Sequence, residues 1–316
     1  MVGGTLRSTP REAVLAEAGM QEVRKAAEGM WVAELARCKE AQEGDPRREW
    51  GLKGVRRRLT RADWRSRAEE LWEELWPGGV RSEEKVLGGE PWGEPLGVSW
   101  DLLGVKGEDK EENRREALDR MSSWGEMSVT IYTDGSAKEG VTNGGAAAVV
   151  THGDPANPER VDERLRAAGK VASSFQAELV ALEEALLWLR EHGDEWRRAM
   201  VVSDSLSCLS ALRNVRGGRM SGLMARVFGL MRELGRGDKE MVMVWVPGHC
   251  GVVGNEWADA AAGRAATGEQ GEAECMYMSL KGTWKRREKT KESWEHERSG
   301  RVYGSGVQRE EENGWS

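Results

Sequence analysis

The sequence is poor in the residues that build zinc sites, disulfide frameworks and membrane spans. Its 316 residues contain four cysteines and four histidines, which are scattered, and no Cys-x-x-Cys pair occurs. No zinc-ligand set and no disulfide framework is therefore predicted. No apolar run approaches the roughly 18 residues of a membrane span, and the N-terminus lacks a signal-peptide core. We expect an intracellular protein, nuclear or cytoplasmic, that is neither secreted nor membrane-bound.

The sequence also lacks an excess of positive charge. It has 47 Lys and Arg against 54 Asp and Glu, a formal net charge of -7. Proteins that bind nucleic acid are usually basic, so this total argues mildly against that class. The argument weakens where acidic residues gather around metal ions, because bound cations offset their charge.

Composition divides the chain into three parts. Residues 1–126 are helix-like and charged, and we expect a loosely packed helical flank in which residues 78–107, rich in Gly and Pro, form a linker. Residues 127–267 have the texture of a folded domain. Residues 268–316 are polar, and a disordered tail is expected. The tail carries a basic cluster, Lys281–Lys291, which is either a solvated segment or a phosphate-binding one.

Short apolar strands and amphipathic helices alternate within residues 127–267. Strands built from β-branched or small residues are predicted at 128–133, 146–150, 160–172, 199–203 and 241–246. Helices are predicted from Ser173 or Ser174 to His192 and at 205–214, 220–234 and 255–266. Asn143-Gly144 suits a hairpin turn. Three strands followed by alternating helices and strands indicate an α/β fold with a mixed sheet and flanking helices.

Four carboxylates stand at strand ends or early in helices. Asp134 and Asp204 each follow a short apolar strand, so their carboxylates would lie about 5 Å apart if these strands are neighbours. Glu178 stands in the first turns of a helix that must pack on the sheet, and Asp259 stands in the helix after the His249 loop. Such a cluster repels itself without cations, and Mg²⁺ prefers carboxylate oxygens. Two such ions about 4 Å apart can clamp a phosphodiester during hydrolysis.

Four segments together resemble ribonuclease H, and most closely the ribonuclease H domains of non-LTR retrotransposons. They are Thr133-Asp134-Gly135-Ser136, Gln176-Ala177-Glu178-Leu179, Ser203-Asp204-Ser205 and the string from Trp245 to Asp259. That string contains His-x-Gly-x-x-Gly-Asn-Glu-x-Ala-Asp, the most specific of the four. The resemblance covers about residues 127–267, in one order and with every acidic position filled.

The resemblance implies a ribonuclease H-like three-layer fold, in which a mixed five-stranded sheet has the order 3-2-1-4-5 with strand 2 antiparallel. It also implies a metal-dependent endonuclease that hydrolyses the RNA strand of RNA–DNA hybrids. Asp134, Glu178, Asp204 and Asp259 would ligate two Mg²⁺ ions, with Mn²⁺ as an alternative, and Asp134 would bridge them. His249 would assist proton transfer or product release, since its ordinary pKa lies near neutrality.

The resemblance further implies a set of residues that contact the hybrid. An RNA strand is distinguished from DNA by its 2′-hydroxyls, which are read in the wide minor groove. The residues that match these positions are Gly135, Ser136, Asn143, Ser173, Gln176 and Asn255. For Asn143, a simple role as a turn residue stays open.

Two features depart from the family or extend it. The segment from Val215 to Met220 is short, so the extra basic helix of some family members is absent, and phosphate affinity would depend on another segment such as Lys281–Lys291. Thr5 to Pro10, with the Ala- and Glu-rich stretch that follows, resembles the segment after the polymerase core in retrotransposon reverse transcriptases. No Asp-Asp polymerase motif is present, so we expect no polymerase activity, and other retrotransposon-encoded proteins are candidate partners.

Two other functions compete with the endonuclease. One is a catalytically inactive, nucleic-acid-binding remnant, which the acidic flanks and the missing polymerase favour and the complete carboxylate set opposes. The other is another nuclease of the same superfamily, such as a transposase core. The His249 loop and the short spacing from Asp204 to Asp259 disfavour it.

Overall fold

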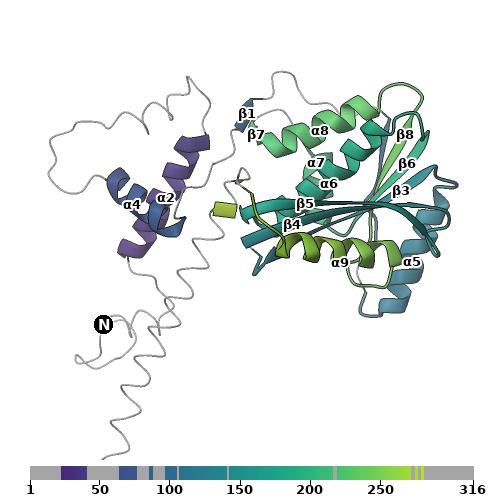
Figure 1. The fold of residues 1–316 in the computed structure, drawn as a ribbon, viewed down its shortest axis with the longest axis horizontal. Helices are drawn as coiled ribbons and strands as arrows, with labels where there is room; N and C mark the ends of the chain where they lie inside the picture. Colours follow the sequence, from purple (N-terminus) through teal and green to yellow (C-terminus); the bar gives the residue numbers. More distant parts are fainter. Residues whose placement is uncertain are drawn as a thin grey trace, which may run out of the picture.

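A six-stranded mixed sheet with helices on both faces forms the main body of the computed structural model (Figure 1). The structure describes residues 23–40, 64–76, 85–87, 97–104, 107–140, 142–215, 219–271, 275–276 and 279–280. The predicted helix start at Thr9-Pro10 and the basic cluster Lys281–Lys291 lie outside the described residues.

The sheet has the strand order β2-β8-β6-β3-β4-β5. Its strands are β2 (Val98–Asp101), β3 (Val129–Lys138), β4 (Thr142–His152), β5 (Glu159–Val171), β6 (Arg198–Ser203) and β8 (Glu240–Trp245). β4 runs antiparallel to β3 and β5, whereas β3, β6, β8 and β2 are parallel. The predicted order 3-2-1-4-5 with an antiparallel second strand is therefore confirmed for β3, β4, β5, β6 and β8.

The sixth strand, β2, corrects the prediction of five. It lies inside the segment 78–107, which was expected to be a linker, and it pairs in parallel with β8, Val98 opposite Met241. A second short strand of that segment, β1 (Lys85–Leu87), pairs with β7 (Arg219–Ser221) in a separate two-stranded sheet. A strand of four residues with a Trp and no periodic run gives too weak a sequence signal to be recognised before its partner is known.

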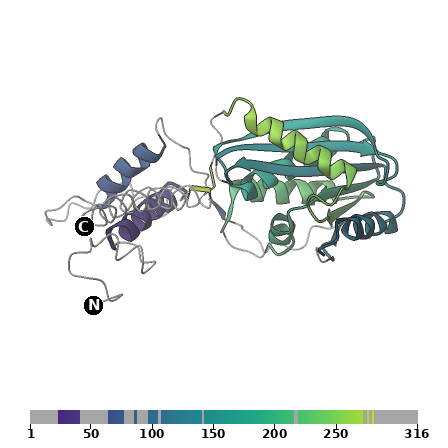
Figure 2. The same ribbon diagram turned by 90° about the horizontal axis from the view of Figure 1, so that it is seen from below.

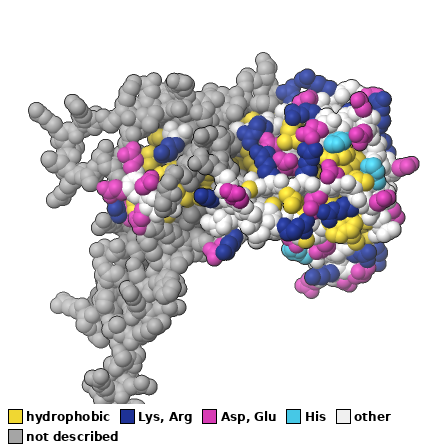
Figure 3. Space-filling model, in the orientation of Figure 1, with side chains coloured by type: hydrophobic (Ala, Val, Ile, Leu, Met, Phe, Trp, Pro, Cys, Tyr) yellow, Lys and Arg dark blue, Asp and Glu magenta, His cyan; other side chains and the backbone are white. Residues whose placement is uncertain are grey.

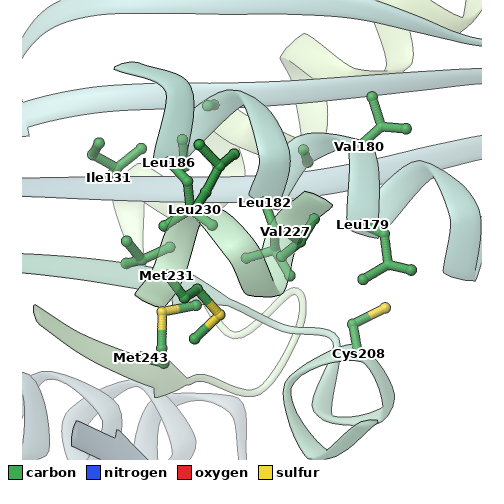
Figure 4. Packing of buried hydrophobic residues seen from close by; sticks show 14 of the residues in the cluster. Ile131, Leu179, Val180, Leu182, Leu186, Cys208, Val227, Leu230, Met231 and Met243 are labelled. Atoms are coloured by element: carbon green, nitrogen blue, oxygen red, sulfur yellow. The ribbon is translucent and has the colours of Figure 1, made fainter. Parts of the chain in front are cut away.

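The helices divide between the two faces of the sheet, as Figures 1 and 2 show. On one face lie α6 (Ser174–Glu191), α7 (Leu206–Arg213) and α8 (Gly222–Leu234), whose apolar residues join Ile131, Val201 and Met243 in the larger core (Figure 4). On the other face lie α9 (Val253–Thr267) and α5 (Lys110–Ser123), packed against Tyr132, Val149 and Val244. The three layers are thus helices, sheet and helices.

The hairpin between β3 and β4 turns at Glu139 and Gly140, not at Asn143-Gly144 as predicted. Glu139 and Gly140 directly follow Lys138, which pairs with Thr142, and both have positive φ angles, 56° and 76°, as residues of hairpin turns commonly do. Asn143 also has a positive φ, 47°, but it lies inside β4 beside a register shift between Gly144 and Gly145. The Asn-Gly pair therefore marks an irregularity in a strand, which the same residue types favour.

Two helices of the N-terminal flank form a small core of their own. α2 (Val23–Glu40) and α4 (Trp64–Leu75) pack together through apolar residues of both helices, among them Leu35, Leu71 and Trp72. Cys275 and Leu280 join this cluster from the segment expected to be a polar tail, and Val171 joins it from the end of β5. Buried apolar side chains at 275–280 therefore connect the flank with the sheet.

The surface of the sheet-containing body mixes both signs of charge (Figure 3). Ion pairs account for part of this mixture: Glu183, which is buried, pairs with Arg166 at 2.8 Å and with Arg226 at 2.6 Å. No helix among the described residues is both long and apolar enough to cross a membrane.

Candidate active site

Asp134 and Asp204 lie side by side on neighbouring parallel strands. β3 and β6 are hydrogen-bonded with Thr133 opposite Ser203, so the next residue on each strand is an aspartate at the same level. Both aspartates were predicted to end their strands: Asp204 directly follows β6, whereas Asp134 lies inside β3, which continues to Lys138. Thr133 Oγ1 donates a hydrogen bond to the Val202 carbonyl at 3.1 Å and fixes the register next to the acidic pair.

Glu178 reaches the same point from helix α6. Ser173 caps this helix by accepting a hydrogen bond from the Gln176 amide at 3.2 Å, which places Glu178 near the start of the helix. Gly135 allows the close approach, because a Cβ at that position would lie 2.1 Å from the Glu178 amide nitrogen. Carboxylate oxygens of Asp134, Glu178 and Asp204 lie within 4.8 Å of one another, and we call these three residues the inner carboxylate group.

The inner carboxylate group is buried and repels itself. Asp134 and Glu178 are each only 7% exposed. Burial raises the pKa of Asp134 from 3.8 to about 7, with the charges of Asp204 and Asp259 adding to the effect and a hydrogen bond from Gly135 opposing it. Burial likewise holds the pKa of Glu178 well above its usual value, and Asp134 and Asp204 raise it further. The folded chain thus maintains ionisable groups where their charge is unfavourable without a cation.

A second acidic group stands at the surface beside the first. It contains His249, Glu256 and Asp259, whose ligand atoms also lie within 4.8 Å of one another, and we call it the outer group. His249 Nδ1 lies 3.8 Å from Asp259 Oδ2, and the two side chains are 66% and 43% exposed. Asp259 belongs to both settings, because its charge also raises the pKa of Asp134 and of Glu178.

The loop that carries His249 runs from Val246 to Val252, between β8 and α9, and we call it the His249 loop. Gly248 lets it pass close to the inner carboxylate group, since a Cβ there would lie 2.5 Å from Asp204 Oδ2. His249 has a φ of 58°, a conformation that costs free energy in any residue except glycine. The Gly251 amide donates a hydrogen bond to Glu256 Oε1 at 3.1 Å and ties the loop to α9.

The six predicted substrate contacts fall into two sets. Gly135, Ser136 and Asn143 are partly exposed on the β3–β4 hairpin, so a substrate contact by them stays a prediction that their position allows. Gln176 and Asn255 are only 2% exposed. The side chain of Gln176 bonds the Ala168 carbonyl, the Met276 amide and the Ser279 hydroxyl.

Ser173, the remaining member of this set, is also bonded within the protein. Its Oγ accepts a hydrogen bond from Ser279 Oγ at 2.9 Å, and its amide donates to the same hydroxyl at 2.9 Å. The segment around Met276 and Ser279 therefore lies directly against two residues that the family resemblance assigns to substrate contact. Nothing in the sequence of the expected tail pointed to this arrangement.

Sequence reasoning also missed Glu256 and Trp245 as parts of the site. Glu256 precedes Asp259 by three residues, a spacing that puts both carboxylates on one face of α9, and this signal was available. The Trp245 indole donates a hydrogen bond to the Asp204 backbone carbonyl at 3.0 Å. A contact of this kind between distant segments leaves no signal in a single sequence.

The inner carboxylate group has the properties of a divalent metal site. Hard cations such as Mg²⁺ bind carboxylate oxygens, and three of these converge here. Glu178 Oε2 is buried and has no hydrogen-bond partner among the described residues, which is costly for a polar atom unless a ligand binds it. These residues therefore fit a divalent cation.

Comparison with known proteins found one matching family and similar solved structures. Residues 126–267 match the family model described as RNase H. Among solved structures, an RNase H1 from the halophilic archaeon Halobacterium salinarum matches with 25% identity and a TM-score of 0.34, covering 43% of this chain and 96% of that one. The N-terminal RNase H domain of rv2228c from Mycobacterium tuberculosis matches with 22% identity and a TM-score of 0.35, covering 44% and 92%. No curated protein matches the sequence.

Proposed function

We propose that the chain, which carries an RNase H domain at residues 126–267, is an endonuclease that hydrolyses the RNA strand of RNA–DNA hybrids with two divalent metal ions. The observation that carries the proposal is the inner carboxylate group: two buried carboxylates with raised pKa values, one with an unpartnered oxygen, beside a third carboxylate. A fold does not require such an arrangement for stability, because it is electrostatically unfavourable.

Four carboxylates would hold the ions. Asp134, Glu178 and Asp204 would ligate one ion. Asp259 would share the other ion with Asp134, whose pKa the charge of Asp259 raises. When bound, two such ions activate a water molecule and stabilise the leaving oxygen of a phosphodiester. We propose Mg²⁺ as the physiological ion, with Mn²⁺ as a substitute, because both accept an all-oxygen ligand set.

His249 would move protons at the edge of the site. Its imidazole is exposed on a loop and lies 3.8 Å from the Asp259 carboxylate, so it can accept a proton near the reacting phosphate and release it to solvent. Asp259 would keep the imidazole pointed at the site. An exposed position suits this role, because the proton must leave with the product.

Selectivity for the hybrid would come from the β3–β4 hairpin. Ser136 and Asn143 carry polar side chains that are partly exposed on this hairpin, next to the strand that holds Asp134. Polar groups at this place can reach 2′-hydroxyls, which identify RNA in a wide minor groove. Gly135, Ser173, Gln176 and Asn255 complete the set proposed for substrate contact, the last three after local rearrangement.

Cleavage of matched substrates tests the proposal. The full chain is incubated in Mg²⁺ with an RNA–DNA hybrid, a duplex RNA and a duplex DNA of one sequence, each strand labelled in turn. Only the RNA strand of the hybrid should be cut, at internal positions, and chelation by EDTA or the substitution Asp134→Asn should stop the reaction. A chain that binds the hybrid without cutting it in either Mg²⁺ or Mn²⁺ would instead be a nucleic-acid-binding remnant.

We also propose that the chain derives from a non-LTR retrotransposon. The support is the resemblance of residues 127–267 to that branch and of Thr5 to Pro10 to a post-polymerase segment, the latter outside the described residues. Sequencing the genomic DNA around the gene tests the origin. A reverse transcriptase frame or its remains upstream would support it, and flanks without any such trace would count against it.

A further inference from the structure

We propose that Arg120, in a helix outside the segment that matches RNase H, is a positioning residue that holds the His249 loop and Asp204 in place. The inference rests on the proposed function, because it assigns a task to a residue that touches neither metal nor substrate. Arg120 lies on α5, which precedes the matched residues 126–267. Helix α5 and strand β2 both lie outside the matched residues, and β2 extends the sheet beside β8.

The guanidinium of Arg120 joins three backbone or side-chain groups of other segments. It donates hydrogen bonds to the backbone carbonyl of Trp245 and to that of Leu103, and it lies 3.6 Å from the Asp101 carboxylate. Trp245 is the last residue of β8, and the His249 loop begins at the next residue. Arg120 therefore binds the chain at the point where the strand gives way to the loop.

Apolar contacts extend the same connection along the loop. Ala117 and Met121, one turn apart on α5 and both fully buried, belong to the cluster that contains Val246, Cys250 and Val252. Farther toward the start of α5, the side chain of Arg114 lies against Gly251. Apolar residues of the loop thus share a buried cluster with α5, and Gly251 lies beside Arg114, while the His249 side chain is 66% exposed.

Trp245 transmits the contact to the inner carboxylate group. Its backbone carbonyl accepts from Arg120, and its indole Nε1 donates to the backbone carbonyl of Asp204 at 3.0 Å. One residue therefore connects α5 with the strand end that carries a metal-ligating carboxylate. A shift of Trp245 would move both the His249 loop and Asp204.

An arginine is needed for this arrangement. Its planar guanidinium holds its donors in a fixed geometry: Nη1 and Nη2 donate to the two carbonyls, while Nε lies 3.6 Å from Asp101 Oδ1 as an ion pair without a hydrogen bond. A lysine keeps the charge, but its single ammonium on a flexible chain cannot hold the same three partners in one geometry. Asp101 is itself buried and also accepts from the Trp124 indole at 3.2 Å, so the far end of the contact is fixed as well.

The test compares Arg120→Ala with Arg115→Ala, an arginine of the same helix whose side chain is exposed and pairs with Glu112. Misplacement of catalytic groups by about 1 Å can cost up to about 100-fold in rate, and we expect Arg120→Ala to lower kcat about tenfold with KM unchanged. Arg115→Ala should leave both constants unchanged. Equal constants for the two variants and the parent would overturn the proposal.

A double substitution separates positioning from general loss of stability. If Arg120 acts through the His249 loop, Arg120→Ala should cost no more than about twofold in kcat once His249→Ala is present, because the two effects are not independent. Full additivity would overturn the action of Arg120 through the His249 loop, because an effect carried by Asp204 or by general stability persists without the imidazole. Should Arg120→Ala fail to fold, Arg120→Lys takes its place with the same measurements, and an unchanged kcat there would overturn the proposal.

Amide hydrogen exchange keeps this test apart from the test of the proposed function. In the metal-free full chain, amides of residues 246–252 should exchange faster in Arg120→Ala than in Arg115→Ala, while those of β3 and α6 stay protected. This result is expected even if the parent chain cleaves no hybrid, in which case the proposed function fails and the positioning role stands. Unchanged exchange in the loop would refute the positioning role, whatever the activity.

Discussion

The inner carboxylate group and the outer group stand next to each other but differ in burial. Asp134 and Glu178 are held on a central strand and at the start of a packed helix, and each is only 7% exposed. His249 and Asp259 stand on a loop and on the open side of a helix, where solvent reaches them. The charge of Asp259 links the two groups, because it raises the pKa of both Asp134 and Glu178.

This difference divides the work of the proposed reaction. A metal ion is bound strongly by carboxylates that are held in place, and in the inner group Glu178 Oε2 is buried without a hydrogen-bond partner among the described residues. A proton carrier must exchange with water and make room for the product, which describes His249. Burial therefore separates the residues proposed to hold cations from the residue proposed to move protons.

The largest effect is expected from substituting one carboxylate of the inner carboxylate group and one of the outer group. Glu178→Gln should lower hybrid cleavage by at least about 1,000-fold, because an interaction worth several kcal/mol in the transition state is lost. It should also abolish the rise in thermal unfolding temperature that Mg²⁺ causes in the parent. Asp259→Asn should lower cleavage but preserve that rise, since the inner group stays complete. Equal loss of the rise in both variants would contradict the division.

The metal-free protein should lose stability as the pH rises from about 4 to about 7. The pKa of Asp134 is raised from 3.8 to about 7, so between these values the unfolded chain releases a proton that the folded chain keeps. The free energy of unfolding should therefore fall by about 4 kcal/mol from pH 4 to pH 7 on account of this group and stay level above. Urea unfolding in EDTA measures it, and Asp134→Asn serves as the reference. A difference between parent and variant that does not change with pH would refute the prediction.

An effect of intermediate size is expected at His249. His249→Ala should lower kcat by about 100-fold, the usual contribution of a positioned proton donor or acceptor, and it should leave the stabilisation by Mg²⁺ unchanged. His192→Ala is the matched control, because His192 stacks on Trp188 away from the site. If His249→Ala weakens Mg²⁺ stabilisation as strongly as Glu178→Gln does, His249 belongs with the metal ligands.

The smallest effect is expected on the substrate side, at Asn143. Asn143→Gly removes the side chain, and glycine adopts the φ of 47° without strain. KM for the hybrid should rise about fivefold with kcat nearly constant, as for the loss of one hydrogen bond of about 1 kcal/mol. Glu139→Gly, at a φ of 56° in the nearby turn, should leave KM unchanged. A raised KM in both variants would assign the effect to the hairpin backbone.

Local patterns were sufficient to predict most of the central fold. β-Branched and aromatic residues in β3 and the helical spacing of leucines in α6 predict their own elements, because each signal comes from the side chains of one segment. The bounds of β5, β6, β8 and the helices between them lie close to those expected, whereas β3 and β4 extend several residues beyond the predicted strands. The convergence of Asp134, Glu178 and Asp204 was predicted as well, and the structure brings the three together.

Contacts between distant segments were not predictable in the same way. β2 is recognisable as a strand only through its pairing with β8. Cys275, Ser279 and Leu280 were expected to lie in a disordered tail, but Cys275 and Leu280 join the cluster of α2 and α4, and Ser279 bonds Ser173. The hairpin turn was placed at Asn143-Gly144, because the same residue types favour a turn and a strand irregularity. Periodicity reports on one segment at a time and carries no information about its partner.

The sequence by itself thus pointed to Asp134, Glu178, Asp204, Asp259 and His249 as candidates for one site, through their places beside strands and helix starts and through the family resemblance, but it did not point to Glu256. Only the tertiary structure decided how they divide into an inner and an outer group, since burial depends on what packs above each residue. It also brought α5 against the His249 loop and set Trp245 between Arg120 and Asp204. These arrangements arise from packing between segments far apart in the chain, and packing is a property of the folded molecule.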